Sequence, residues 1–388
     1  MPTAVAGELR RWLGAREQEM VDALVRLASV ETPSSVPEAH DVALDLLAAE
    51  LESLPYAVRL VCGERTAGVL YARPAERRRG APFQLLVGHV DTVWPLGSVA
   101  TLGVFAENGV VRGPGVFDMK GGLVEMVYGL RAIAELGLEP EVTPVVFVNT
   151  DEEIGSRESR GLLTRLARSA SRAYVLEPAY GPSGRLKTAR KSAGRFVVVV
   201  RGRAAHAGVN PEEGLSAILE LSHQIQRLFA LNDATRGITV NVGTIDGGLG
   251  ANVVAAEARA EVDVRVPTLE DARAIERALS ELRPVGTGLT VEVEGRFGRL
   301  PLEATPRNRA LWHAARAAGE ALGLELEEAS VGGASDGNIT SLHTATLDGL
   351  GPIGDGAHAP EEHVLVSSLC ERAALLALLV LLPAEVEP

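Results

Sequence analysis

The sequence predicts an α/β protein in which a mostly parallel sheet, covered by helices, is interrupted by a second domain. Short β-branched strands alternate with amphipathic helices over residues 1–187, an order typical of a parallel sheet with helices on both faces. Over residues 188–298 the order changes to β-α-β-β-α-β, which is that of a ferredoxin-like fold. The first pattern resumes over residues 299–388, so we interpret the middle segment as an inserted domain.

The first domain is expected to begin with a helix over residues 5–30, because Met20, Leu24 and Leu27 recur on one face at helical spacing. The apolar run 373–382 is too short to cross a bilayer and predicts a buried terminal helix. The other elements expected in this domain are, in order, a helix near 38–53, strands near 57–62, 69–71 and 83–87, a helix after Gly122, a strand over 145–148, a helix near 158–168, a strand over 173–176, and helices near 307–322 and 365–382.

The inserted domain is expected to have one buried and one wet sheet face. Residues 256–266 alternate strictly, with Ala258 and Val262 on one face and Arg259 and Asp263 on the other, a pattern typical of a half-buried strand. The elements expected here are strands over 195–201, 238–245, 256–266 and 289–294, and helices over 214–231 and near 270–282.

Composition places the chain among globular proteins and argues against some partners. Its 388 residues are 46% hydrophobic and 23% charged, enough for two domains with a sizeable core. A net charge of −13 argues against nucleic acid or an acidic membrane as a partner. Cys62 and Cys370 lie far apart and predict reduced thiols, which favours the cytoplasm. No apolar run follows the first arginines, so no signal peptide is expected.

The stretch that points to chemistry is the strand at residues 145–148 and the polar turn that follows it. The turn contains three consecutive acids, Asp151, Glu152 and Glu153. Adjacent carboxylates repel one another, so they require solvent counter-ions, a basic partner or a metal. Taken alone, such a turn is usually a solvated acidic loop. It becomes a candidate for a functional site because other segments also end in acidic or histidine residues.

Several first-domain segments carry ligand-type residues where open α/β sheets collect ligands, outside the carboxyl ends of strands. Imidazole and carboxylate together suit zinc or a similar divalent metal, whereas oxygen ligands alone suggest magnesium or calcium. Singly, each residue could be structural; Asp118, for example, could be a helix N-cap. The candidates are His89, Asp118, Glu152 with Glu153, Glu177 and His358.

These candidates could form a two-metal site. One metal could bind His89 and Glu177, and a second could bind His358 and Glu153, with Asp118 bridging them. Three carboxylates and a bridging hydroxide would balance the charge of two divalent ions. Such a neutral site suits a partly desolvated cleft.

The candidates also fall within recognisable motifs, namely Gly88–Val93, Gly115–Gly122, Asn149–Ser156, Glu177-Pro178 and Ala357–Val364. In this combination the sequence resembles the dinuclear-zinc aminoacylase and carboxypeptidase family, and within it the bacterial glutamate carboxypeptidases most. The family also includes acetylornithine deacetylase and succinyl-diaminopimelate desuccinylase. The resemblance covers nearly the whole chain, including the inserted domain.

The resemblance implies particular roles for the first-domain residues. It makes Glu152 the general base and Glu153 a metal ligand, and it makes Asp91 the residue that holds the imidazole of His89. It implies two zinc ions per subunit, with cobalt or manganese as substitutes. It also implies a cis peptide bond between Asp118 and Met119.

For the inserted domain, the resemblance implies a dimerisation and lid role. His206 would stabilise the oxyanion by reaching across a homodimer interface into the partner's site. Asn252 would contact substrate, and Arg265 and Arg299 would bind its free carboxylate, for which a bidentate arginine is suited. The arginines could instead belong to a solvated strand face, where Asp263 lies beside Arg265.

The expected function is that of a cytoplasmic, homodimeric zinc hydrolase. It would remove a C-terminal amino acid, with glutamate as a candidate, from a small peptide or N-acyl conjugate. The alternatives are an N-acyl amino-acid deacylase, a non-catalytic relative used for binding, and a two-metal phosphoesterase. The sequence departs from the family at residues 332–337, which leaves the pocket shape open, and at Met119, where glutamate carboxypeptidases often have a second Asp.

Overall fold

The structure is a computed structural model that describes residues 3–77 and 80–384. It divides into two compact units, each with its own sheet and core. The first unit consists of Met1–Thr188, Ala304–Ser330 and Ser335–Pro388, and the second consists of Ala189–Glu303 and Val331–Ala334. Among the described residues, no helix combines the length and apolar character needed to cross a membrane.

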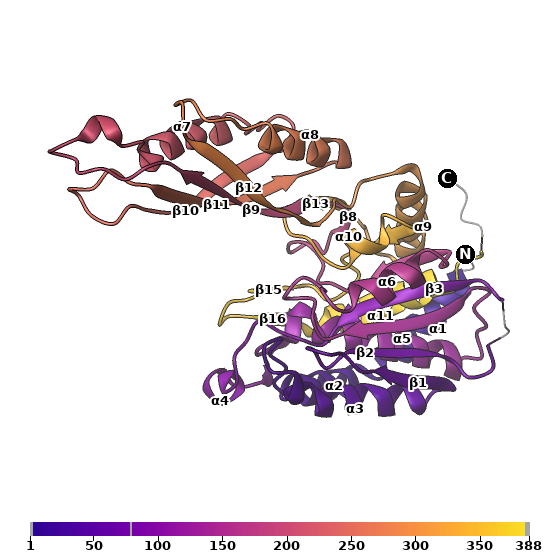
Figure 1. Ribbon diagram of the computed structural model, residues 1–388. Helices are drawn as coiled ribbons and strands as arrows, with labels where there is room; N and C mark the ends of the chain where they lie inside the picture. The colour runs from indigo at the N-terminus through magenta and orange to yellow at the C-terminus, as the bar shows by residue number, and fades with distance from the viewer. Residues whose placement is uncertain (1–2, 78–79, 385–388) are drawn as a thin grey trace. The chain divides into compact units, whose positions relative to one another are not determined.

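A six-stranded, mostly parallel sheet forms the centre of the first unit (Figure 1). Strands β6, β3, β7 and β14 run parallel in that order, and β2 and β1 continue the sheet antiparallel beyond β6. The central strands are almost entirely buried, as expected where helices cover both faces. The strands are β1 (Tyr56–Val61), β2 (Val69–Pro74), β3 (Phe83–His89), β6 (Thr143–Asn149), β7 (Arg172–Val175) and β14 (Ala345–Leu347).

Helices cover both faces of this sheet, because the strand side chains alternate between two cores. Leu86 and Val146 face the larger core, which contains α1, α2, α3, α5, α9 and α11, while Leu85 and Val145 face a smaller core with α6 and α10. The helices are α1 (Thr3–Gly14), α2 (Glu17–Ala28), η1 (Pro37–His40), α3 (Asp41–Glu52), α4 (Ser98–Leu102), α5 (Gly121–Glu135), α6 (Arg160–Ala167), α9 (Pro306–Leu322), α10 (Gly337–Thr340) and α11 (Val366–Val380).

A small second sheet in the first unit was not foreseen from the sequence. Its strands pair in the order β15-β16-β5-β4, all antiparallel. They are too short to show a period in the sequence: β4 (Phe105–Glu107), β5 (Val110–Arg112), β15 (Gly354–Asp355) and β16 (His363–Leu365). A further pair, β8 (Leu186–Arg190) and β13 (Glu328–Val331), lies where the chain passes from one unit to the other.

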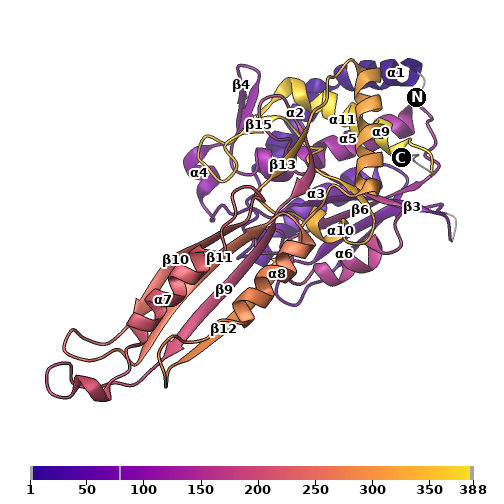
Figure 2. The same cartoon turned by 90° about the horizontal axis from the view of Figure 1, so that it is seen from above.

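The second unit has the predicted β-α-β-β-α-β order. Its four-stranded sheet is antiparallel in the order β10-β11-β9-β12, and α7 and α8 pack on one face (Figure 2). Ala258 and Val262 are buried beneath these helices, as their alternation predicted. The elements are β9 (Ser192–Arg201), η3 (Pro211–Glu213), α7 (Ala217–Phe229), β10 (Thr239–Gly247), β11 (Glu257–Val266), α8 (Leu269–Ser280) and β12 (Thr290–Arg299).

The predicted fold class is confirmed, with errors at particular elements. The single helix expected over residues 5–30 is wrong, since α1 ends at Gly14 and α2 begins at Glu17. Glycine weakens a helix, and the turn lets the apolar faces of both helices enter the same core. The helix expected from Gly214 begins only at Ala217, after Ser216, whose hydroxyl accepts a capping hydrogen bond from the Leu219 N–H (3.2 Å).

Candidate metal centre

Three neighbouring parallel strands deliver four acidic or imidazole side chains to one edge of the first unit's sheet. His89 is the last residue of β3, Glu152 and Glu153 follow β6, and Glu177 follows β7. Because β3 lies between β6 and β7 and runs parallel to both, their carboxyl ends meet. This part of the prediction follows from strand order alone.

Asp118 and His358 reach the same place by another route. Asp118 lies in η2 (Val116–Lys120), a short π-helical turn beyond β5, and His358 lies in the loop between β15 and β16. The expectation that both follow strands of the main sheet is therefore wrong. It is the small sheet that brings them together, because β16 pairs with β5. The Asp118–Met119 peptide bond is cis, as the resemblance implied.

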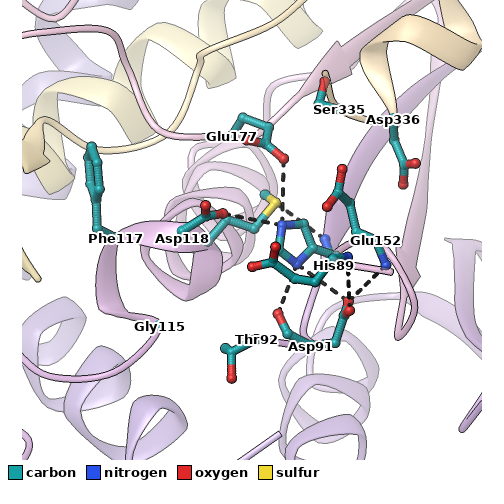
Figure 3. A network of polar contacts seen from close by, with 12 residues as sticks. His89, Asp91, Thr92, Gly115, Phe117, Asp118, Glu152, Glu177, Ser335 and Asp336 are labelled. Carbon is teal, nitrogen blue, oxygen red and sulfur yellow. Dashed lines mark hydrogen bonds and ion pairs between the residues drawn. The ribbon is translucent and has the colours of Figure 1, made fainter. Parts of the chain in front are cut away.

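Asp118 lies between two histidines, each of which also faces a glutamate. Figure 3 shows the His89 side, where the imidazole contacts both Asp118 and Glu177. On one side, His89 Nε2 is 3.3 Å from Asp118 Oδ1 and 3.5 Å from Glu177 Oε1. On the other, His358 Nε2 is 3.4 Å from Asp118 Oδ2 and 3.3 Å from Glu153 Oε1. The five side chains thus form two half-sites that share one carboxylate.

The donor set fits divalent metal ions. Ligand atoms of His89, Glu152 and Glu177 lie within 4.8 Å of one another, and so do those of His89, Asp118 and Glu153. His89 Nε2 and Asp118 Oδ1 are buried, and neither forms a hydrogen bond of acceptable geometry within the described part of the chain. Buried nitrogen and oxygen atoms usually form hydrogen bonds. Atoms of this kind that converge without doing so are arranged as ligands around a common cation.

The electrostatics of the cluster favour positive charge at both histidines. Burial lowers the pKa of His89, but its contacts with Asp118, Asp91 and Glu177 raise it well above the ordinary value. Contacts with Asp118 and Glu153 raise the pKa of His358 to about 10. Burial would raise the pKa of Asp118, but the two histidines lower it far below its usual range. The carboxylates thus favour positive charge at the positions that metal ions would take, where a metal would compete with protons.

Asp91 joins His89 to the acidic turn. Its buried carboxylate accepts hydrogen bonds from the N–H groups of Glu152 (3.2 Å) and Glu153 (3.1 Å) and from Ser34 Oγ (2.7 Å). Its backbone carbonyl is 2.9 Å from His89 Nδ1, nearer than its carboxylate at 3.4 Å. Asp91 therefore contacts the imidazole as expected, chiefly through the main chain, and it also fixes the backbone of two neighbouring acids.

Glu152 is 7% exposed, and its carboxylate lies beside His89 and Glu177. The turn that carries it is held by a polar network that the sequence analysis missed. Asn149 Nδ2 donates to Asp336 Oδ2 (2.7 Å), and Ser156 Oγ donates to Asp336 Oδ1. Asp336 belongs to the segment 332–337, whose departure from the family pattern was the only signal available.

The remaining predicted site residues all lie in the second unit, in two groups. His206 and Asn252 are exposed neighbours, since the Ala207 N–H donates to the Asn252 carbonyl (3.0 Å). Arg265 and Arg299 occupy the strands on either side of Ala193.

Arg265 already has a carboxylate partner. Its Nε and terminal NH₂ donate to Asp263 at 2.9 and 3.0 Å, and both side chains are partly exposed. This is the pairing expected of a solvated strand face. A substrate carboxylate would have to compete with Asp263 for the same guanidinium.

Comparison with known proteins agrees with a peptidase of this fold. The family model for Peptidase family M20/M25/M40 matches residues 85–382. Carboxypeptidase G2 of Pseudomonas sp. (strain RS-16) is 29% identical over 379 residues, which cover 93% of this chain and 88% of the relative.

Two solved structures share the fold. Aminopeptidase PepT of Bacillus cereus has a TM-score of 0.77 at 22% identity, covering 94% of this chain and 98% of its own. The Bacillus subtilis YXEP protein, described as a dinuclear metal-binding peptidase of family M20, has a TM-score of 0.72 at 16% identity, covering 95% and 98%.

The fold and the clustered imidazole and carboxylate groups define a hydrolase of the metallopeptidase class. The chain belongs to peptidase family M20/M25/M40. The resemblance drawn from the sequence motifs is confirmed at the level of the family.

The shared position of Asp118 predicts how metal binding responds to substitution. Asp118→Ala should weaken metal binding at both half-sites. The loss of affinity should exceed the factor of about 10 to 100 that is typical when a residue next to a metal ligand is replaced. Glu177→Ala should weaken metal binding only at the half-site that contains His89. Metal content per subunit after equilibration with limiting zinc checks this. Asp355→Ala, which removes an exposed carboxylate near His358, is the control. Equal metal content in the Asp118 and Asp355 variants would contradict a shared ligand.

Proposed function

We propose that this protein is a hydrolase with two zinc ions that cleaves the amide bond of a C-terminal amino acid, in a small peptide or N-acyl conjugate. The observation that carries the proposal is the position of Asp118, with a histidine and a glutamate on each side. Mixed nitrogen and oxygen ligands suit zinc, with cobalt or manganese as substitutes.

The chain's own residues supply the proton transfers. Two bound divalent cations would polarise the amide carbonyl and make a water molecule more acidic. Glu152 takes the proton from the attacking water and passes it to the leaving amine. Its buried position gives the carboxylate a low-dielectric setting, and its backbone N–H is fixed by Asp91. The resemblance of the sequence motifs makes Glu152 the general base, and Glu177 and Glu153 each lie against the histidine of one half-site.

The substrate's carboxylate is assigned to the arginine pair of the second unit. Arg265 and Arg299 flank the same residue of β9, so both present charge at one end of the sheet. A planar guanidinium binds a carboxylate through two hydrogen bonds. The similarity to carboxypeptidase G2 supports a C-terminal amino acid as the leaving group. The resemblance of the sequence motifs to the bacterial glutamate carboxypeptidases makes glutamate the first candidate.

The geometry of the second unit supports a homodimer in which His206 acts on the partner's substrate. Arg265 and Arg299 pair with Ala193 near the start of β9, whereas His206 follows the other end of β9 at Arg201. A strand of this length spans about 30 Å. The arginines and His206 of one subunit therefore cannot contact the same small substrate.

A surface for the second subunit is available on the second unit. β10 is an edge strand of the sheet, and edge strands commonly pair with another chain. Large apolar side chains are exposed along β10, the loop after it and α7, which is typical of an interface. They are Ile218, Leu219, Phe229, Ile245 and Leu249. A cytoplasmic location remains part of the proposal, supported by the free thiols of Cys62 and Cys370.

An N-acyl amino-acid deacylase is the second candidate, favoured by one observation. The pairing of Arg265 with Asp263 would weaken a clamp for a free carboxylate, so selection could rest on the acyl side of the amide. A panel of amides varied on each side of the scissile bond separates the two functions. If the rate of hydrolysis changes mainly with the identity of the amino acid, the carboxypeptidase is supported. If it changes mainly with the identity of the acyl group, the deacylase is supported.

Replacing the general base should separate metal binding from turnover. Glu152→Gln is expected to keep the wild-type metal content and to lower kcat by about 10²- to 10⁴-fold, because an amide cannot accept the proton. Metal analysis and steady-state kinetics on the same preparation check both parts. Wild-type turnover in the metal-loaded variant would remove Glu152 from this role.

Removing the proposed clamp should raise KM. Arg265→Ala is expected to raise KM for carboxylate-bearing substrates by about 10- to 100-fold with little change in kcat, as for the loss of a charged, uniformly binding contact. Arg259→Ala is the matched control, since Arg259 lies on the same strand and pairs with Glu261 at the surface (2.9 Å). An unchanged KM in the Arg265 variant would count against the clamp.

Action across a dimer interface can be tested by mixing inactive variants. His206→Ala and Glu152→Gln subunits, exchanged by mild unfolding and refolding, should regain about a quarter of wild-type activity. Half of the dimers would be mixed, and each mixed dimer would have one intact site. If His206 acts within its own subunit, no mixed dimer has an intact site and activity stays at the level of the separate variants.

A further inference from the structure

We propose that Glu362 is a positioning residue that fixes Asp118 and His358 relative to each other, and that the metal affinity of the centre depends on it. The inference rests on the proposed metal centre. Glu362 lies four positions after His358, in the loop before β16, and is 1% exposed.

The carboxylate of Glu362 accepts four hydrogen bonds. Oε1 accepts from the N–H groups of Phe117 (2.9 Å) and Asp118 (3.0 Å). Oε2 accepts from the Gly115 N–H (3.0 Å) and from Trp94 Nε1 (2.8 Å). Three of the four donors are thus backbone groups of the segment that ends at the shared ligand.

The main chain of Glu362 is fixed on the His358 side. Its N–H donates to the Ala359 carbonyl (3.0 Å), which closes a turn next to His358. Its carbonyl accepts from the Gly113 N–H (3.2 Å), and the following residue, His363, pairs with Arg112 in the small sheet. One residue therefore ties together the two loops that carry Asp118 and His358.

This connection matters because a bridging ligand tolerates little rotation. Asp118 presents Oδ1 toward His89 and Oδ2 toward His358, so a turn of its backbone would spoil both half-sites at once. The N–H of Asp118 itself is bonded to Glu362, and Asp118 (φ −114°, ψ 96°) and Met119 both depart from helical backbone angles within the turn. At this residue the backbone N–H is therefore held by the Glu362 carboxylate.

The chemistry of the contact calls for a carboxylate. Each oxygen faces two N–H donors, and a buried ion is stabilised only when its lone pairs are filled in this way. A glutamine has the same shape but turns an NH₂ group toward two of the donors. Glu362→Gln should therefore loosen the segment around Asp118 while it changes volume very little.

The test compares Glu362→Gln with Glu361→Gln, which removes the same charge from the exposed adjacent residue. Zinc affinity is measured by competition with a chelator, and the visible spectrum of the cobalt-loaded protein reports ligand geometry. We expect affinity at both half-sites to fall by about 10- to 100-fold in the Glu362 variant, with an altered cobalt spectrum. The Glu361 variant should match the wild type.

The outcomes separate this inference from the proposed function. A wild-type protein that binds no metal would overturn both. Wild-type metal binding together with wild-type affinity and spectrum in Glu362→Gln would overturn only the role of Glu362. If Glu362→Gln does not fold, as judged by circular dichroism of the metal-free protein, Trp94→Phe takes its place. That variant loses one of the four donors, so a smaller fall in affinity is expected, and unchanged affinity would overturn the proposal.

Discussion

The centre depends on one electrostatic constraint: three carboxylates gather at a largely buried edge of the sheet, around two imidazoles. Asp118, Glu153 and Glu177 lie within 3.5 Å of a histidine nitrogen, and the acids would repel one another in a low-dielectric site without positive charge between them. The same carboxylates raise the pKa of His89 and His358, which favours positive charge on both imidazoles. The same geometry therefore explains the raised pKa of both imidazoles and the capacity to hold cations.

Around the ligands, the chain uses further acids to hold backbone in place. Asp91 accepts the N–H groups of Glu152 and Glu153, Asp336 accepts from side chains that flank the same turn, and Glu362 accepts from the segment ending at Asp118. Each of these acids has its oxygens bonded to donors, which stabilise the buried carboxylate while it holds the neighbouring segment in place. Outer residues of this kind fix the angles at which ligands meet a metal.

The two units hold different groups of candidate functional residues. All the candidate metal ligands belong to the first unit, whose parallel sheet and small antiparallel sheet converge on one place. The second unit holds the candidate substrate contacts in two groups at opposite ends of β9. The length of one strand separates these groups, and this spacing supports the proposed homodimer.

The sequence by itself determined the fold class, the inserted βαββαβ order and the metal-ligand candidates. Strands and helices of ordinary length leave clear periods, and His89, Glu153 and Glu177 lie at or shortly after the ends of strands. It did not show the break between α1 and α2, the strands of the small sheet, or the roles of Asp336 and Glu362. Strands of two or three residues carry no period, and a single acid in a loop reveals nothing about its donors. Only the tertiary structure decided that β16 pairs with β5 and so brings His358 to Asp118, because that contact joins segments more than 200 residues apart in the chain.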